Sequence, residues 1–302
     1  MSYYVLQCNT TAIGEIVKPS VLSADFSYIQ CYHFLSEAVD WFMNKVSVLM
    51  DYLEFGHGDK NLVIIPGLSV QSVMGSAEAV KEAFKGFGQD FTIRLFDRRK
   101  NLPPVYSIAD MAQDTVSVIR KLGLKDLYLF GASQGGMICM EIASSYPSLV
   151  HSMVLASTSC RITKDRYKVI DHWVSLAKKG DSEALYLSFG EKLYPQAVFN
   201  QNRNLLVSMA KTVTPDELSR FVTLAQTMQG YDISDRLERV ACPVLVVGDT
   251  DDRVLGSSAS AEVFECFKGR PDWALYMYEG YGHAVYDLAP DFRERMAAWF
   301  LK

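Results

Sequence analysis

A serine stands between two glycines in the segment LYLFGASQGGMICMEIA, residues 128–144. Gly131, Ser133 and Gly135 form a G-x-S-x-G pattern that directly follows a short apolar run and directly precedes a helical one. In a sharp turn from a strand into a helix, such a serine has a strained backbone and a hydroxyl that stands clear of the sheet. Glycine is then needed two residues away on either side, because a larger side chain would collide. A helix-capping serine in a glycine-rich turn does not explain both glycines, so we predict that Ser133 is a nucleophile.

A serine hydroxyl is a weak nucleophile, so this prediction requires a base and a carboxylate that orients the base. Where the nucleophile occupies such a turn, the chain order is nucleophile, acid, histidine. Among the five histidines, His283 is the one that follows every candidate acid. It lies in EGYGHAVYD, a glycine-containing loop just after the last predicted strand. We therefore predict that His283 is the general base.

Three aspartates compete for the role of the orienting acid. Asp249, Asp251 and Asp252 lie in VGDTDDRV, directly after the apolar run PVLVV. Asp249 follows the strand so closely that it is expected to shape the turn. The side chains of Asp251 and Asp252 are adjacent and point in opposing directions, so only one of them can face His283.

The elements that would position these residues alternate between strands and helices. Mostly apolar runs predict strands at residues 45–56, 61–67, 91–97, 126–130, 152–157, 243–248 and 273–280. A helix is expected near residues 76–86, and Ser107 with Asp110 predicts the capping box of another, which ends at Gly123. Wholly apolar strands are typical of a parallel sheet, and the alternation predicts a doubly wound, mostly parallel α/β sheet.

The alternation stops between residues 160 and 240. Residues 163–180 carry apolar side chains at helical spacing, and a second helical pattern begins with a capping box of Thr214 and Glu217. Open α/β sheets bind their ligands beyond the carboxyl ends of the strands, where such an inserted segment would lie. We therefore predict a helical cap inserted before the acid-bearing strand, the alternative being a purely structural insertion.

This pattern divides the chain into three parts. Residues 43–159 and 241–302 are predicted to form the α/β core, and residues 160–240 the helical cap. Residues 1–42 do not share the pattern and are predicted to be an N-terminal extension of unknown role.

The composition excludes several classes of function. The chain has 302 residues and a formal net charge of -5, which argues against a nucleic-acid or membrane-surface partner. No apolar run is long enough to span a bilayer, and the first residues lack the pattern of a secretion signal. The six cysteines are scattered, without a CxxC pair or a Cys/His cluster of zinc spacing. We expect a cytoplasmic protein with reduced thiols, no cofactor and no metal, whose oligomeric state stays open.

From about Met43 to Lys302, the sequence resembles cap-bearing members of the α/β-hydrolase superfamily, close to enol-lactonases and esterases. The elbow GASQGG, the acid turn GDTDDRV, the base loop GYGHAVYDLAPDF and DRR at 97–99 carry this resemblance. It implies the α/β-hydrolase fold and a Ser-His-Asp triad. In resembling sequences the acid immediately precedes an Arg-Val or Pro-Val pair. Because Arg253-Val254 follow Asp252 here, the resemblance implies Asp252 as the acid, with Asp251 as the alternative.

The chain departs from the family pattern at two places beside the predicted site. Pro66-Gly67-Leu68 stands where family members usually have His-Gly, and DRRKNLPP replaces the usual DRRGxG. An oxyanion hole consists of backbone N–H groups, expected here from Leu68 and Gln134, so proline at position 66 removes no donor. Arg98 and Arg99 have two interpretations, binding of a substrate carboxylate or structural pairing with Asp97 and neighbouring loops, of which we favour the second.

These residues together predict a serine hydrolase that cleaves a small-molecule carboxylic ester or lactone through an acyl-enzyme on Ser133. One alternative is a carbon–carbon bond hydrolase or lyase that uses the same triad. Another, of a different class, is a non-catalytic ligand receptor on the same fold. An intact triad argues against the receptor, because a receptor has no use for a strained serine.

Overall fold

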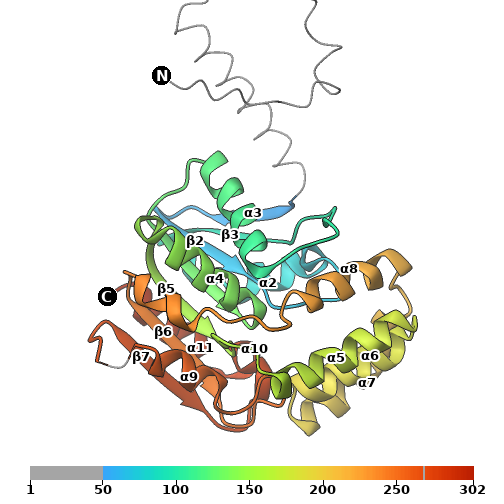
Figure 1. The fold of residues 1–302 in the computed structure, drawn as a ribbon. Helices are drawn as coiled ribbons and strands as arrows, with labels where there is room; N and C mark the ends of the chain where they lie inside the picture. The colour runs from blue at the N-terminus through green and yellow to red at the C-terminus, as the bar shows by residue number, and fades with distance from the viewer. Residues whose placement is uncertain (1–49, 268) are drawn as a thin grey trace, which may run out of the picture. The chain divides into compact units, whose positions relative to one another are not determined.

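The computed structural model describes residues 50–267 and 269–302, and the N-terminal extension predicted at residues 1–42 lies outside the described residues. One seven-stranded sheet runs through the described part (Figure 1). Its strands are β1 Tyr52–Gly56, β2 Lys60–Ile65, β3 Phe91–Phe96, β4 Leu127–Ala132, β5 Val150–Ala156, β6 Val244–Asp249 and β7 Trp273–Tyr278. Their order is β1-β3-β2-β4-β5-β6-β7, with β1 antiparallel to β3 and the other pairs parallel.

The strand order reverses at β2, which lies between β3 and β4. The chain leaves β2 toward one edge of the sheet, and β4 then begins the run toward the other edge. Such a reversal opens a crevice beyond the carboxyl ends of the two strands, which is the usual ligand site of open α/β sheets. The crevice here lies between the ends of β2 and β4.

Helices cover both faces of this sheet, which confirms the predicted doubly wound α/β architecture. The helices of the core are α2 Ala77–Ala83, α3 Ile108–Lys121, α4 Gln134–Ser145, α9 Ala259–Glu265, α10 Val285–Leu288 and α11 Phe292–Phe300. Alternate strand residues face opposite sides, so that Leu129 belongs to the cluster of α3, α4 and α9, whereas Phe130 belongs to that of α11.

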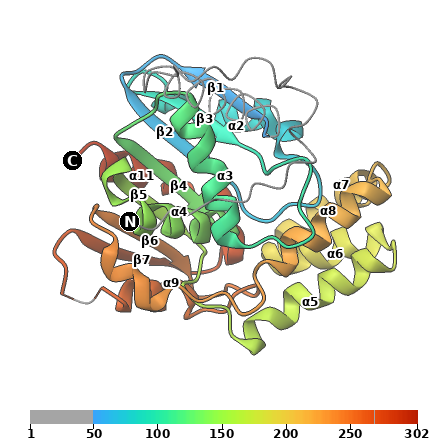
Figure 2. The same ribbon diagram turned by 45° about the horizontal axis from the view of Figure 1, so that its top comes forward.

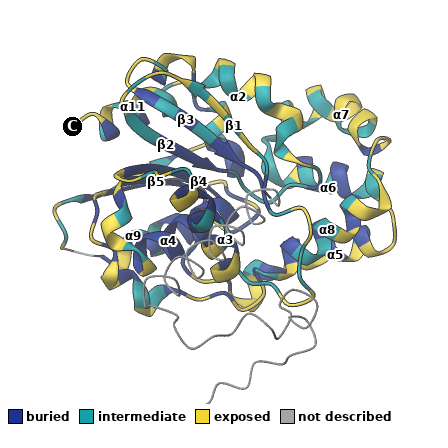
Figure 3. Cartoon of the chain, turned by 90° about the horizontal axis from the view of Figure 1, so that it is seen from above, coloured by how far each residue is buried: buried dark blue, intermediate teal, exposed yellow. Residues whose placement is uncertain are grey.

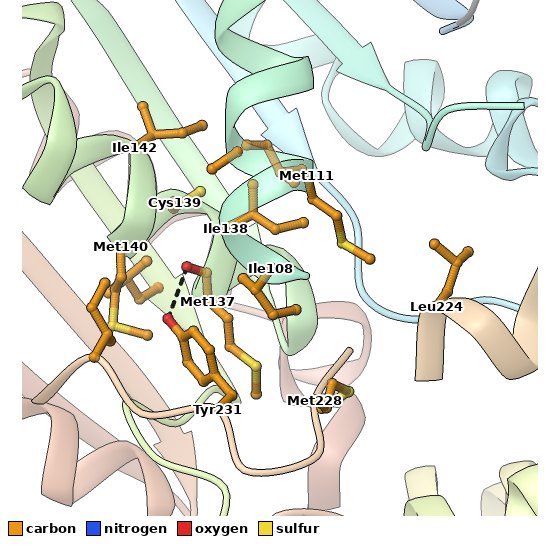
Figure 4. Packing of buried hydrophobic residues seen from close by; sticks show 14 of the residues in the cluster. Ile108, Met111, Met137, Ile138, Cys139, Met140, Ile142, Leu224, Met228 and Tyr231 are labelled. Atoms are coloured by element: carbon orange, nitrogen blue, oxygen red, sulfur yellow. Dashed lines mark hydrogen bonds between the residues drawn. The ribbon is translucent and has the colours of Figure 1, made fainter. Parts of the chain in front are cut away.

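Helix α4 is buried along almost its whole length. Of its residues only the last, Ser145, is not buried, and the surrounding side chains come from α3 and from the segment after α8 (Figure 4). The Tyr231 hydroxyl donates to the carbonyl of Met137 over 3.2 Å, which ties that segment to the first turns of α4. Packing on every side holds the N-terminus of α4 in place, and Ser133 lies there.

Four helices lie between β5 and β6 and are grouped at one end of the sheet (Figures 1 and 2). They are α5 Lys164–Lys178, α6 Ser182–Leu193, α7 Gln196–Ala210 and α8 Pro215–Gln226. The predicted capping box begins α8, since Thr214 accepts from the Glu217 N–H and Glu217 accepts from the Thr214 N–H. Figure 3 shows that α7 is mostly intermediate or exposed, in contrast to α4.

Four arginine–carboxylate pairs join the segment between β5 and β6 to the core, one of them between Arg161 and Glu262 at 3.8 Å. Arg166 of α5 donates to both carboxylate oxygens of Glu262 on α9, at 2.5 and 2.8 Å. Arg220 on α8 contacts Asp97 after β3, and Arg236 after α8 contacts Glu141 on α4. The pairs of Arg166 with Glu262 and of Arg236 with Glu141 are bidentate, and such pairs fix geometry as well as adding stability.

We expect Glu262→Gln to lower the free energy of unfolding at pH 7 by about 1–2 kcal/mol, because the charge-assisted bonds from Arg166 are weakened. The hydrogen bond from Arg166 lowers the pKa of Glu262 in the folded chain. A lowered pKa stabilises the fold above the ordinary glutamate range, and this stabilisation is lost as the pH falls through the lowered value. Urea denaturation at pH 7, 5 and 3.5 should therefore show the two proteins converging at the acid end.

Glu78→Gln is the matched control, since Glu78 pairs with Lys81 on the exposed surface of α2. Its effect at pH 7 should stay below about 0.5 kcal/mol. Equal unfolding midpoints of Glu262→Gln and the native protein at pH 7 would contradict a stabilising role for the pair with Arg166.

Candidate active site

Ser133 occupies the turn between β4 and α4 with a strained backbone. Its φ is 52° and its ψ is -120°, a conformation that residues other than glycine rarely adopt. Neighbouring groups hold this conformation in place: the Ser133 N–H donates to the Ala156 carbonyl at 2.8 Å, and the Thr158 hydroxyl donates to the Ser133 carbonyl at 2.7 Å. The strain lies where the sequence predicted it, and surrounding structure must supply the energy that it costs, about 1–3 kcal/mol.

The two glycines of the motif allow close backbone approach. A Cβ on Gly135 would lie 1.9 Å from the Ile65 carbonyl oxygen, and a Cβ on Gly131 would lie 2.6 Å from the Cys139 sulfur. Both separations are far below van der Waals contact. The glycines thus let the start of α4 pack against the end of β2, and this contact brings the two sides of the crevice together.

His283 follows β7 and contacts Asp252, which follows β6. The distance from His283 Nδ1 to Asp252 Oδ2 is 2.8 Å, and the two residues are 2% and 7% exposed. The other carboxylate oxygen of Asp252 accepts the N–H groups of Val254 and Leu255, at 2.8 and 3.0 Å. Both oxygens are therefore bonded, and the carboxylate is fixed toward the imidazole.

The pKa of Asp252 reflects two opposing influences. Burial alone would raise it, but the nearby charge of His283 and the hydrogen bonds from His283, Leu255 and Val254 outweigh burial and hold the pKa below its usual range. The carboxylate is therefore ionised at neutral pH, as the partner of a histidine base must be.

The other two aspartates of the turn bond to backbone groups. Asp249 accepts the N–H groups of Asp251 and Tyr281, at 2.8 and 3.0 Å. Asp251 accepts the Gly280 N–H at 2.9 Å. Both carboxylates thus join the turn after β6 to the loop after β7, and among the three competing aspartates only Asp252 contacts the His283 ring.

A small cavity of about 20 Å³ lies over Ser133. The core contributes Ser133, His283 and the loop after β2, whereas the segment between β5 and β6 contributes apolar side chains. The complete lining is Gly67, Leu68, Ser133, Ile170, Trp173, Phe189, Leu193, Met228, Val254, His283 and Tyr286. Ser133 and His283 thus face one mostly apolar space, in which electrostatic interactions are stronger than in water.

Leu68 and Gln134 lie on the two sides of the crevice next to Ser133. A Cβ on Gly67 would lie 3.3 Å from the Ser133 Cβ, so the loop that carries Leu68 passes close to the serine. Gln134 is the first residue of α4, where a helix leaves its N–H groups without an internal acceptor. The role of the Leu68 and Gln134 backbone N–H groups as an oxyanion hole stays a prediction.

The side chain of Gln134 makes contacts that the sequence did not reveal. Its amide nitrogen donates to the Leu224 carbonyl at 2.8 Å and to the Thr227 hydroxyl at 3.3 Å. Gln134 therefore links the residue after Ser133 to the last turn of α8. The partners are 90 and 93 residues away in sequence, so no local pattern could have indicated them.

Asp97 and Arg98 of the motif DRR contact the loop after β2. Arg98 donates to the Pro66 carbonyl at 2.5 Å, and burial lowers the pKa of Arg98 to about 10. Asp97 accepts from the Ser72 hydroxyl at 2.5 Å and pairs with Arg220 of α8 at 3.2 Å. These contacts agree with the structural interpretation of Arg98, which holds the loop rather than facing the cavity over Ser133.

Within residues 50–267 and 269–302, no three or more His, Cys, Asp or Glu side chains gather as a potential metal site. No helix in the same ranges has the length and apolar character needed to cross a membrane.

Comparison with known proteins identifies relatives of this sequence and fold. Residues 84–231 match the family described as "alpha/beta hydrolase fold". The protein named "Putative carbamate hydrolase RutD" of Agrobacterium fabrum is 24% identical over 249 residues, which are 78% of this chain and 93% of that protein.

Two crystal structures share the fold. An α/β-hydrolase enzyme from a Medee basin deep-sea metagenome library has a TM-score of 0.74 at 19% identity, covering 84% of this chain and 94% of its own. The enol-lactonase from Burkholderia xenovorans LB400 has a TM-score of 0.71 at 15% identity, covering 84% and 96%.

Proposed function

We propose that this chain is a hydrolase of the α/β-hydrolase superfamily that cleaves carboxylic esters or lactones through an acyl-enzyme on Ser133. The observation that carries the proposal is the buried His283–Asp252 contact, which lies beside a strained serine that opens onto the same cavity. A nucleophile, a base and an orienting acid supply the three functions that acyl transfer by a serine requires.

In the first half of the proposed reaction, the Ser133 hydroxyl attacks the ester carbonyl carbon while His283 accepts the hydroxyl proton. Asp252 holds the imidazole in the tautomer that can accept this proton and stabilises the imidazolium that forms. The N–H groups of Leu68 and Gln134 donate to the carbonyl oxygen as it becomes negatively charged. His283 then protonates the leaving alcohol, and the acyl group remains on Ser133.

In the second half, water attacks the acyl carbonyl carbon, and His283 accepts a proton from the water. The same two backbone N–H groups bind the second oxyanion. When the intermediate collapses, Ser133 leaves with the proton that His283 returns, and the carboxylic acid is released. The sum is one ester and one water converted into one acid and one alcohol.

We also propose that residues 160–240 act as a cap on a core formed by residues 43–159 and 241–302. The support is that the segment between β5 and β6 supplies Trp173, Phe189 and other apolar side chains to the cavity over Ser133. A cap that contributes cavity walls excludes water from the carbonyl under attack and selects substrates by their shape.

A carbamate is a second candidate substrate, because the relative from Agrobacterium fabrum bears the name of a carbamate hydrolase. The same residues would attack its carbonyl carbon, and the oxyanion would form at the same place. A carbamate differs from an ester in the nitrogen attached to that carbon, which makes the carbonyl less reactive.

The experiment that tests the proposal compares methyl butanoate, a γ-lactone and a methyl N-alkylcarbamate as substrates of the native protein. We expect the ester or the lactone to turn over and hydroxylamine to intercept the acyl group as a hydroxamate, because the intermediate is an ester of Ser133. Carbamate as the preferred substrate would move the assignment to the second candidate. Turnover of none of the three, with no trapped acyl group, would contradict the proposed function.

A further inference from the structure

A second and much larger cavity adjoins the one over Ser133. Its volume is about 690 Å³, within the range of pockets that hold small organic ligands. Gly67, Leu68, Phe189, Leu193 and Tyr286 line both cavities, so the two are contiguous. The larger one extends from these shared residues along α2 on one side and along α6 and α7 on the other. Most of its wall is aliphatic or aromatic.

Helix α7 exposes two large apolar side chains in this cavity. Ala210 is the one buried residue among its 15, whereas α5 buries five residues over the same length. Leu205 and Met209 of α7 line the large cavity and are 58% and 40% exposed. Within residues 50–267 and 269–302, no side chain covers Leu205 and Met209, and exposed apolar groups of this kind mark a binding surface. Because this cavity is continuous with the one over Ser133, a substrate bound at Ser133 can extend to these side chains.

The position of His283 indicates which part of the substrate it is. His283 lines the small cavity but not the large one. The leaving oxygen must reach His283 to be protonated, so the alcohol lies on the side of the small cavity. The remaining substituent of the carbonyl carbon, the acyl chain, then extends past Gly67 and Leu68 into the large cavity.

We infer that the substrate is an ester of a long or bulky apolar acid with a small alcohol, a class to which methyl esters belong. This inference rests on the proposed esterase activity of Ser133 and adds to it the assignment of the two cavities. The large cavity binds the acyl chain against Leu205 and Met209. The small one accommodates an alcohol little larger than water, in keeping with its volume of about 20 Å³. Acylation releases methanol with the proton from His283, and hydrolysis then releases the fatty or aryl-alkyl acid.

Two isomeric esters test the assignment with hydrophobicity held constant. Methyl octanoate and heptyl acetate have the same atoms, but the first carries its chain on the acyl side and the second on the alcohol side. We expect kcat/KM for methyl octanoate, measured by pH-stat, to exceed that for heptyl acetate by at least about 100-fold, because only its chain fits the large cavity. Equal values, or a preference for heptyl acetate, would overturn the assignment while leaving the esterase activity established.

A variant of α7 tests whether the preference for methyl octanoate depends on the wall of the large cavity. Leu205→Asp should lower the ratio of the two kcat/KM values by about tenfold, and Leu205→Met should preserve the ratio. A ratio measured on one preparation does not depend on how much of the protein is folded. Val105→Asp is the control, because Val105 is 86% exposed and lines neither cavity.

The outcomes separate the two proposals. An unchanged ratio in Leu205→Asp would overturn the role of α7 in acyl binding. Labelling of the native protein by a fluorophosphonate without hydrolysis of either isomer would overturn the substrate assignment alone. Absence of both labelling and hydrolysis would overturn the proposed function itself, and this inference with it.

Discussion

Replacing Ser133 by alanine is expected to lower kcat for ester hydrolysis by roughly four to six orders of magnitude and to abolish labelling by a fluorophosphonate. The proposed reaction depends on a covalent bond to the Ser133 oxygen, and no neighbouring group could replace it in the same geometry. The hydroxyl is also the atom that a fluorophosphonate phosphonylates. Turnover and labelling should therefore disappear together, and mass spectrometry of the labelled native protein should locate the adduct on Ser133.

The fold should survive this substitution, because alanine loses only an oxygen that points into the cavity. Alanine at the same positive φ keeps the strain that serine already has. Ser144→Ala is a matched control, since Ser144 is a buried serine of α4 whose hydroxyl donates to the Glu141 carbonyl. It should retain near-native turnover and full labelling. Labelling retained in Ser133→Ala would place the nucleophile elsewhere and contradict the proposed mechanism.

Features that depend on short-range sterics were predictable from the sequence. Gly131 and Gly135 flank Ser133 because one turn cannot admit larger side chains, and this constraint is visible in five residues. Wholly apolar runs such as that of β4 indicate strands buried on both faces, and the capping box at Thr214 marks the start of α8 without further information. Local chemistry determines each of these elements, so local patterns revealed them.

Features that depend on the approach of distant segments were not predictable in this way. The Gln134 side chain binds the end of α8, and Arg98 holds the Pro66 carbonyl 32 residues away. Neither contact leaves a signature in spacing or residue type, because a glutamine or an arginine can satisfy its donors in many ways. The uncovered apolar face of α7 is a similar case, since exposure depends on what else packs there.

The assignment of the orienting acid draws on both the sequence and the structure. The residue pattern left Asp251 and Asp252 open, because it could say that only one of them faces His283 but not which. The resemblance to other sequences favoured Asp252, and the structure places the Asp252 carboxylate 2.8 Å from His283 Nδ1. The catalytic role of that contact stays a prediction, which substitution of Asp252 tests.

Asp252→Asn is expected to lower kcat by roughly three to four orders of magnitude while leaving KM within a few-fold of its native value. Asparagine can occupy the same space and keep one oxygen for the N–H groups of Val254 and Leu255. Its amide group, however, would donate to Nδ1 and favour the histidine tautomer that cannot accept the Ser133 proton. It also removes the negative charge that stabilises the imidazolium. Chemistry should therefore be lost while substrate binding is retained.

Asp251→Asn and Asp249→Asn separate this effect from damage to the turn. At position 251 an asparagine oxygen can still accept the Gly280 N–H. Asp249 accepts one N–H group with each carboxylate oxygen, so asparagine there keeps only one of the two bonds. Each substitution should cost at most about 1–2 kcal/mol in unfolding free energy and less than about tenfold in kcat. Because all three variants neutralise one carboxylate of the same turn, a general loss of charge would affect them alike. A collapse of activity in Asp251→Asn with near-native turnover in Asp252→Asn would mean that the 2.8 Å contact with His283 is structural, and that the orienting acid is the adjacent residue.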